Sequence, residues 1–121
     1  MDFSLKERID LLHDTNQISD EIYDRLPAIL ETVENFLEVK LSEENAGSFA
    51  SHISIALQRI SDKNPLTDIS GELQTVIEEN PNFYLFAKEL LSANNQKGAD
   101  IDAEAAFLTL YFGVLTREEN A

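Results

Sequence analysis

Two pairs of residues in this sequence have the types and the spacing that could do chemistry. The first pair is His52 and Arg59, which lie seven residues apart and suit a reactive histidine with a positive charge on the same side of a helix. The second pair is Glu104 and Tyr111, whose carboxylate and phenol could line one side of a shallow site. Because seven residues make about two helical turns, each pair requires a helix to present it.

The segment Ser42 to Ile60, SEENAGSFASHISIALQRI, is predicted to be the helix that carries His52. Ser42 is a candidate N-cap, and two glutamates follow in the first turn, where carboxylates interact favourably with the helix dipole. Apolar residues then recur every three or four positions, which is typical of one buried helical face; they are Ala46, Phe49, Ala50, Ile53, Leu57 and Ile60. His52 lies beside this stripe, at the border between core and solvent. A lone histidine there is more often a half-buried packing residue than a catalyst, so that alternative stays open.

The chain before this segment is expected to contain two helices. Residues 5–12 could form a short one, and His13 at its end is interpreted as a solvated partner of the helix dipole. Ser19 begins the second, which keeps helical spacing to about Val39. Pro27 interrupts it, and because proline lacks a backbone N–H and disfavours helix at the preceding residue, we expect a kink or a break there.

The chain after this segment is expected to contain three more helical stretches. A short helix ends near Glu79, Asn80 and Pro81 start the next as N-cap and first residue, and Asp100 or Asp102 caps the last. The last helix is apolar around nearly its whole circumference, which places it in a bundle centre or at a subunit interface. No segment alternates as a strand does, and the stretches comprise four well-marked helices and one or two short ones. We therefore predict an all-α compact bundle of about five helices, in one domain over residues 1–121.

Composition limits the classes of function. The chain has 23 acidic and 9 basic residues, a net charge of -14, and its cations are scattered, which disfavours direct binding of nucleic acid or anionic lipid. Its longest apolar run, AAFLTLYFGVL, is too short to span a membrane, and the charged amino terminus is unlike a signal peptide. There is no cysteine, and the two histidines are far apart, so we expect neither a metal site nor a cofactor and favour the cytoplasm.

Three stretches follow one another in this order: EENAGSFASHISIALQRI, IEENPNFYLFAKELL and DAEAAFLTLYFGVL. Together they resemble the PRD, the phosphotransferase-system regulation domain of bacterial antiterminators and transcriptional activators, and the similarity spans about residues 22–116. It rests on a His-Ile pair with an arginine seven residues on, an Asn-Pro-x-x-Tyr helix start, and a glutamate seven residues before a second histidine position. The resemblance implies a helical bundle that commonly dimerises, in which histidines accept phosphoryl groups from phosphotransferase-system proteins.

Carried over residue by residue, the resemblance gives His52 the role of phospho-acceptor and Arg59 that of phosphate-supporting residue. Glu104 matches the glutamate of the final helix, and Tyr111 stands at the position of the second histidine. A phenol with a pKa near 10 is a poor acceptor beside a largely neutral imidazole, so only the first site is expected to be active.

The resemblance therefore implies a regulatory, non-enzymatic protein that takes phosphate from a phosphotransferase-system phosphocarrier protein, forms a homodimer and signals through protein partners in transcription regulation. Because no RNA-binding or helix-turn-helix segment precedes the module in this sequence, we expect a stand-alone single-PRD protein. One alternative is a non-phosphorylated dimerisation or scaffold module that keeps the PRD shape. A small enzyme, with His52, Glu104 and Tyr111 converging on a substrate, is a further alternative, although no nucleophile and base occur together in a recognisable motif.

Overall fold

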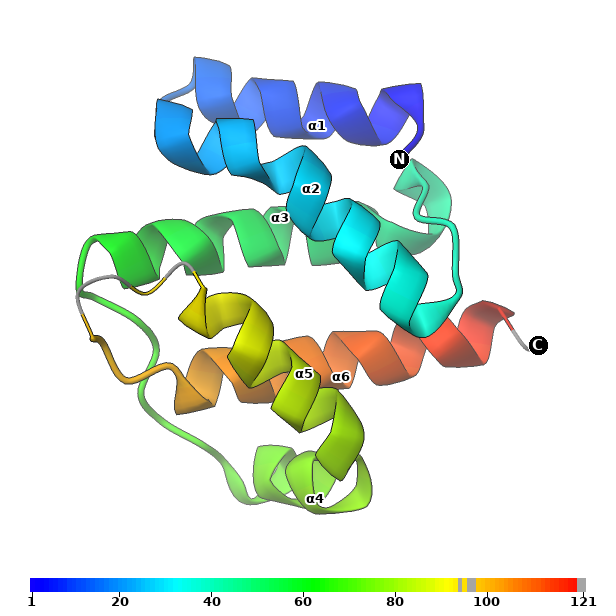
Figure 1. Ribbon diagram of the computed structural model, residues 1–121, viewed down its shortest axis with the longest axis vertical. Helices are drawn as coiled ribbons and strands as arrows, with labels where there is room; N and C mark the ends of the chain where they lie inside the picture. The colour runs from blue at the N-terminus through cyan, green and yellow to red at the C-terminus, as the bar shows by residue number, and fades with distance from the viewer. Residues whose placement is uncertain (94, 96–97, 120–121) are drawn as a thin grey trace. The chain divides into compact units, whose positions relative to one another are not determined.

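The fold is a set of six α-helices in the computed structural model, which describes residues 1–93, 95 and 98–119 (Figure 1). The helices are α1 (Phe3–Asp14), α2 (Asp20–Leu37), α3 (Glu43–Ser61), α4 (Gly71–Glu79), α5 (Pro81–Ser92) and α6 (Asp102–Glu119). The predicted all-α class is confirmed, since the regular elements in these residues are all helical.

The predicted number of about five helices is wrong, because both short segments form complete helices. A side-chain cap stabilises each of them at its amino end. Asp2 accepts a 2.8 Å hydrogen bond from the backbone N–H of Leu5 in α1, and Ser70 accepts one of 3.2 Å from Leu73 in α4.

Pro27 does not divide α2. The helix runs from Asp20 to Leu37 with the proline inside it, so the predicted alternative of a break is wrong. Ser19 caps the helix as expected, accepting a hydrogen bond from Ile22 at 3.3 Å. The helix ends two residues before Val39, because Glu38 adopts a left-handed conformation with φ of 56°.

Internal contacts divide the chain into two compact units, which we describe separately. Unit 1 comprises Met1–Gln58 and Leu115–Ala121, and unit 2 comprises Arg59–Val114. The boundary falls within the last two turns of α3 and again near the end of α6. The single domain predicted over residues 1–121 stays a prediction.

Unit 1 contains α1, α2 and most of α3. Helices α1 and α2 pack against each other and run in roughly opposite directions (Figure 1). The buried apolar side chains of the three helices include Leu5, Ile9, Ile22, Leu26, Leu30, Val33, Ala46, Phe49, Ala50, Ile53 and Leu57. The stripe predicted for α3 is therefore a buried face, and Ser42 caps the helix by accepting a 3.3 Å hydrogen bond from Asn45.

Unit 2 contains α4, α5, most of α6 and the last residues of α3. Phe112 of α6 is fully buried, with its ring centroid 6.2 Å from that of Phe83 and 5.5 Å from that of Phe86, both on α5. Asn80 precedes α5 but does not cap it through its side chain, which instead donates a 2.9 Å hydrogen bond to the carbonyl of Val76. Asn80 is therefore the N-cap residue of α5, as predicted, with Pro81 as the first helical residue, but its side chain makes no capping hydrogen bond.

Candidate functional site

His52 lies in the middle of α3, as the sequence predicted, and belongs to unit 1. Its side chain is half-buried, and its ring atom Nε2 is itself buried. An attacking nitrogen must face the incoming phosphorus atom, so transfer to Nε2 requires the ring or its surroundings to move first. The imidazole is therefore placed at the border between core and solvent, with one ring nitrogen on the inner side.

Arg8 of α1 lies across α3 beside the residue that precedes His52. Its Nη1 donates a 3.1 Å hydrogen bond to Oγ of Ser51, and its Nε lies 3.1 and 3.0 Å from the two carboxylate oxygens of Glu43. Nη2 also pairs with Glu43. The hydrogen bond from Arg8 holds the pKa of the Glu43 carboxyl below its usual range. The sequence did not predict this contact, because a charged residue on a short helix is usually expected to be exposed to solvent.

Gly47 is the feature of α3 that makes room for the Arg8 guanidinium. A Cβ atom added at this buried position would lie 2.9 Å from Oε1 of Glu43 and 3.0 Å from Nη2 of Arg8. Glycine inside a helix costs about 1 kcal/mol relative to alanine, so it needs a packing reason. The close approach of the ion pair is that reason, and an isolated mid-helix glycine was the one sequence signal that could have indicated it.

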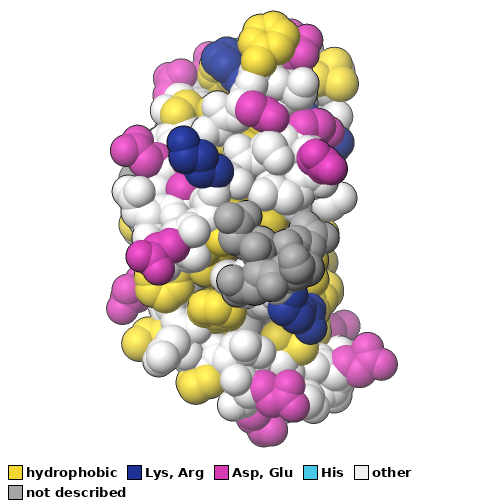
Figure 2. Space-filling view, turned by 90° about the vertical axis from the view of Figure 1, so that its right-hand side faces the viewer, with side chains coloured by type: hydrophobic (Ala, Val, Ile, Leu, Met, Phe, Trp, Pro, Cys, Tyr) yellow, Lys and Arg dark blue, Asp and Glu magenta, His cyan; other side chains and the backbone are white. Residues whose placement is uncertain are grey.

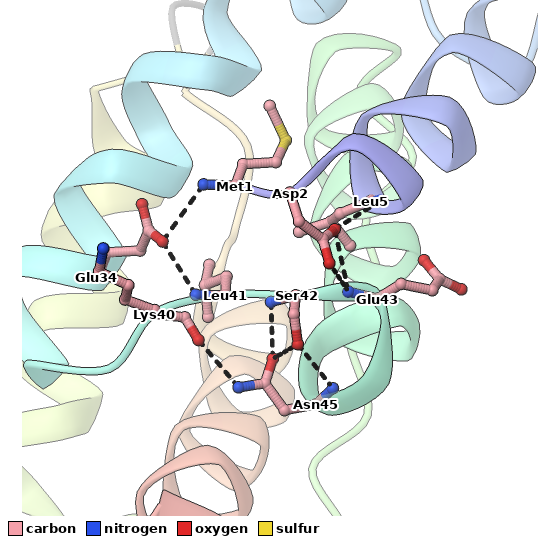
Figure 3. A network of polar contacts seen from close by, with 9 residues as sticks. All are labelled: Met1, Asp2, Leu5, Glu34, Lys40, Leu41, Ser42, Glu43 and Asn45. Carbon is pink, nitrogen blue, oxygen red and sulfur yellow. Dashed lines mark hydrogen bonds and ion pairs between the residues drawn. The ribbon is translucent and has the colours of Figure 1, made fainter.

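Asp2 joins the amino ends of α1 and α3. Figure 3 shows its carboxylate between the two helices, where it accepts the N–H of Leu5 and also the N–H of Glu43 at 3.2 and 3.3 Å. The same figure shows Glu34 accepting the N–H of Leu41 at 2.9 Å. A hollow of about 730 Å³ lies here, lined in part by Asp2, Glu34 and Lys40. It includes none of the site residues predicted from the sequence.

Arg59 and Glu104 are brought together within unit 2. Nε and Nη2 of Arg59 each donate a 2.8 Å hydrogen bond to the Glu104 carboxylate, which has 0% exposed surface. One carboxylate oxygen also accepts the backbone N–H of Leu66 at 3.2 Å, from the loop between α3 and α4. These hydrogen bonds raise the pKa of Arg59 above its usual value. The pair thus ties α6 to the end of α3 and to the loop that follows.

Tyr111 lies on α6 and is half-buried. The sequence placed it with Glu104 along one side of a shallow site, whereas the structure turns the Glu104 carboxylate into the interior, where Arg59 binds it. Of the four predicted residues, Arg59, Glu104 and Tyr111 belong to unit 2 and His52 to unit 1. The predicted roles of all four stay predictions.

His13, the other histidine, lies at the end of α1. Its ring stacks on Tyr23, with centroids 4.2 Å apart, and its Nε2 lies 2.6 Å from Oδ1 of Asp20. Tyr23 in turn donates a hydrogen bond of 2.5 Å to Asp10. The imidazole therefore packs in the turn between α1 and α2, among carboxylates that would repel a phosphate.

Charge on the surface follows the composition. On the face shown in Figure 2, Asp and Glu side chains are spread widely and Lys and Arg are few. Among the described residues, no group of three or more His, Asp or Glu side chains is placed to hold a metal ion. No helix in the described part of the chain is both long and apolar enough to cross a membrane.

Comparison with known proteins assigns the family. The family model of the PRD domain matches residues 27–115, which is most of the 121-residue chain. The chain belongs to the PRD family. PRD domains are regulation domains of the phosphotransferase system, are regulatory rather than catalytic, and are generally phosphorylated on histidine. No curated protein and no solved structure gave a significant match to the chain.

The PRD match contains His52, Arg59, Glu104 and Tyr111. It begins within α2, so α1 and with it Arg8 precede the matched region. The recognition made from the sequence, which spanned about residues 22–116, is confirmed by this match. The contacts that α1 makes with α3 therefore involve a helix outside the region that the family model matches.

Proposed function

We propose that this chain is a regulatory PRD module that accepts a phosphoryl group on His52 and signals through protein partners. The observation that carries the proposal is that the matched region holds a single histidine, His52. His13 lies before the match, in contact with Asp20. Since PRD domains are generally phosphorylated on histidine, His52 is the residue of this chain that fits the role.

The proposed transfer needs no metal or bound nucleotide from this chain. A neutral imidazole nitrogen of His52 attacks the phosphorus atom, a new N–P bond forms, and the bond from phosphorus to the donor's leaving atom breaks. The electron pair of that bond stays with the donor, so no oxidation or reduction takes place. The donor is proposed to be a phosphocarrier protein of the phosphotransferase system.

The product carries a dianionic phosphate in a chain whose net charge is already -14. Repulsion of nearby carboxylates and new hydrogen bonds to the phosphate then change how the helices and any second subunit pack. We propose that this change acts in a homodimer, in the bacterial cytoplasm, and controls transcription through a partner protein.

Phosphate incorporation tests the proposal. The chain is incubated with a phosphoenolpyruvate-driven phosphorelay, and its intact mass is measured under non-acidic conditions that preserve phosphohistidine. We expect wild type and His13→Gln to gain one phosphate and His52→Ala to gain none. No gain by wild type, while the relay phosphorylates a known substrate, would refute the proposal.

A second function, a scaffold that keeps the PRD shape without phosphorylation, is favoured by two observations. The resemblance puts Tyr111 where the second histidine would be, and Nε2 of His52 is buried. If the chain is such a scaffold, His52→Ala leaves the oligomeric state and any partner binding unchanged, with or without the relay. Sedimentation analysis of wild type and His52→Ala, each before and after treatment with the relay, separates the two functions. Only a regulatory module changes its oligomeric state when wild type is phosphorylated.

A further inference from the structure

The cation on the helix of His52 is already bound elsewhere. Arg59 is the only lysine or arginine in α3, and two of its nitrogens donate hydrogen bonds to Glu104. Because the Glu104 carboxylate is fully buried, drawing Arg59 away would leave a buried charge without its partner, which is strongly unfavourable. A phosphate on α3 therefore calls for a different cation.

Arg8 brings such a cation to α3 from α1. Its Nη1 is 3.1 Å from Oγ of Ser51, and Ser51 is the residue directly before His52. His52 follows Ser51 by about 100° around α3 and about 1.5 Å along it, so the guanidinium must swing round the helix from Ser51 to meet a phosphoryl group on the imidazole, and the long, flexible arginine side chain permits this movement. Arg8, Ser51 and His52 all belong to unit 1.

Arg8 can release its present partner, the carboxylate of Glu43. The side chains of Arg8 and Glu43 are 39% and 34% exposed, so water and salt screen their attraction. If the guanidinium departs, the Glu43 carboxylate can be solvated, unlike the buried carboxylate of Glu104. Arg59 is therefore held in place by the buried carboxylate of Glu104, whereas Arg8 can exchange the carboxylate of Glu43 for another anion.

The other cations of unit 1 are directed elsewhere. The part of unit 1 up to Gln58 holds four lysines and arginines, and its carboxyl-terminal part adds Arg117, which is exposed in the last turn of α6. Lys6 binds Asp10 on its own helix, Arg25 binds Glu21 on its own helix, and Lys40 lies in the loop before α3. Arg8 is the one whose guanidinium donates hydrogen bonds to side chains of α3.

The chemistry of arginine suits a phosphate in this position. A phosphoryl group carries about two negative charges and three acceptor oxygens, and a guanidinium can donate two parallel hydrogen bonds to it. Gly47 keeps the surface of α3 open where the guanidinium lies, so the group can shift along the helix without meeting a side chain at that position.

We propose that Arg8 is a phosphate-binding residue of the His52 site, which exchanges the carboxylate of Glu43 for the phosphoryl group when His52 is phosphorylated. The inference rests on the proposed phosphorylation of His52 and adds α1 as the element that detects it. Because Asp2 caps both α1 and α3, movement of Arg8 is transmitted to the contact between the amino ends of the two helices.

The test measures the ratio of phosphorylated to unphosphorylated chain at equilibrium with a fixed pool of phosphorylated donor, by intact mass. Arg8→Gln is expected to lower this ratio roughly three- to tenfold, because it removes a charge-assisted contact made only in the phosphorylated state. Glu43→Gln is expected to raise it by a similar factor, because it removes the competing carboxylate. Lys6→Gln and Glu44→Gln are matched controls for loss of a cation from α1 and of an acid from α3.

The double variant Arg8→Gln/Glu43→Gln separates exchange from a general charge effect. We expect it to behave as Arg8→Gln alone, because Glu43 acts only by holding Arg8. Equal ratios for Arg8→Gln and wild type, or for Arg8→Gln and Lys6→Gln, would overturn the inference while leaving phosphorylation of His52 in place. No phosphate on wild type with an active relay would overturn both.

Discussion

The guanidinium of Arg59 and the carboxylate of Glu104 meet through two hydrogen bonds of 2.8 Å, although 45 residues separate them in the sequence. The carboxylate has no exposed surface, and a third donor, the N–H of Leu66, reaches it at 3.2 Å. A buried carboxylate is stable only when such donors surround it. The pair is therefore a structural requirement of unit 2.

Removing the cation of this pair is expected to destabilise the chain severely. Arg59→Met leaves the Glu104 carboxylate buried without its charged partner, which costs about 3–5 kcal/mol in the free energy of unfolding. Urea denaturation of wild type and variant measures the difference. The double variant Arg59→Met/Glu104→Gln should recover part of the loss, because no buried charge remains.

The exposed pair of Lys88 and Asp102 provides the control, with a separation of 3.1 Å and side chains 40% and 49% exposed. Lys88→Met should cost at most about 1 kcal/mol. Equal costs for Lys88→Met and Arg59→Met would contradict the structural role that we give to the buried pair.

Gly47→Ala is expected to loosen α1 while strengthening α3. The added Cβ lies 2.9 Å from Oε1 of Glu43, so the ends of the Glu43 and Arg8 side chains must move apart, while alanine improves helix propensity by about 1 kcal/mol. Hydrogen exchange should become faster in α1 and slower in α3. Ser48→Ala, at an exposed position of the same helix, should leave α1 unchanged. Unaltered exchange in α1 of Gly47→Ala would show that the glycine does not serve the ion pair.

Acid is expected to weaken the contact between α1 and α3. The hydrogen bond from Arg8 lowers the pKa of Glu43 from its ordinary value of 4.5. A lowered pKa means that the contribution to stability is complete above pH 4.5 and is lost as the pH falls through the folded-state value. In Glu43→Gln this part of the acid sensitivity should disappear.

Urea midpoints measured from neutral pH down to about pH 3 follow this loss. Asp10 keeps a similar dependence in the variant, because its hydrogen bond from Tyr23 and its contact with Lys6 also lower its pKa. Acid should therefore lower the urea midpoint of both wild type and Glu43→Gln, but by less in Glu43→Gln. Identical pH profiles would contradict the assignment of the Glu43 pKa shift to Arg8.

Local patterns in the sequence predicted the elements well. The apolar spacing of α3 and the cap at Ser42 follow from interactions within about one turn, which a sequence displays directly. The six-helix count was missed because the sequence does not reveal how firmly short helices are capped, as Asp2 and Ser70 cap theirs.

The polar contacts of the candidate site were beyond sequence reasoning. Helix periodicity relates Glu104 only to residues of its own helix, such as Tyr111, whereas its partner Arg59 lies on α3. Likewise, Arg8 and Glu43 are 35 residues apart. Partners that are distant in sequence depend on how helices pack, and one sequence without packing information does not specify them.

Tyr111→His is expected to create a second acceptor. The sequence resemblance puts Tyr111 at the second histidine position of the PRD pattern. The side chain is half-buried, so an imidazole fits the site with less volume than the phenol. With an active relay, the variant should gain two phosphates by intact mass, and the double variant His52→Ala/Tyr111→His should gain one. A single phosphate on Tyr111→His would indicate that the surroundings of this position no longer support transfer.

The most direct test of the central claim is a nitrogen-15 NMR spectrum of the chain labelled in the rings of both histidines, recorded before and after phosphorylation. With only His13 and His52 present, two sets of ring signals are expected. We predict that both His52 ring nitrogens shift and that the phosphorylated one couples to phosphorus, while Nε2 of His13 keeps its contact with Asp20. Coupling to phosphorus at His13, or at neither histidine while the relay is active, would contradict the account.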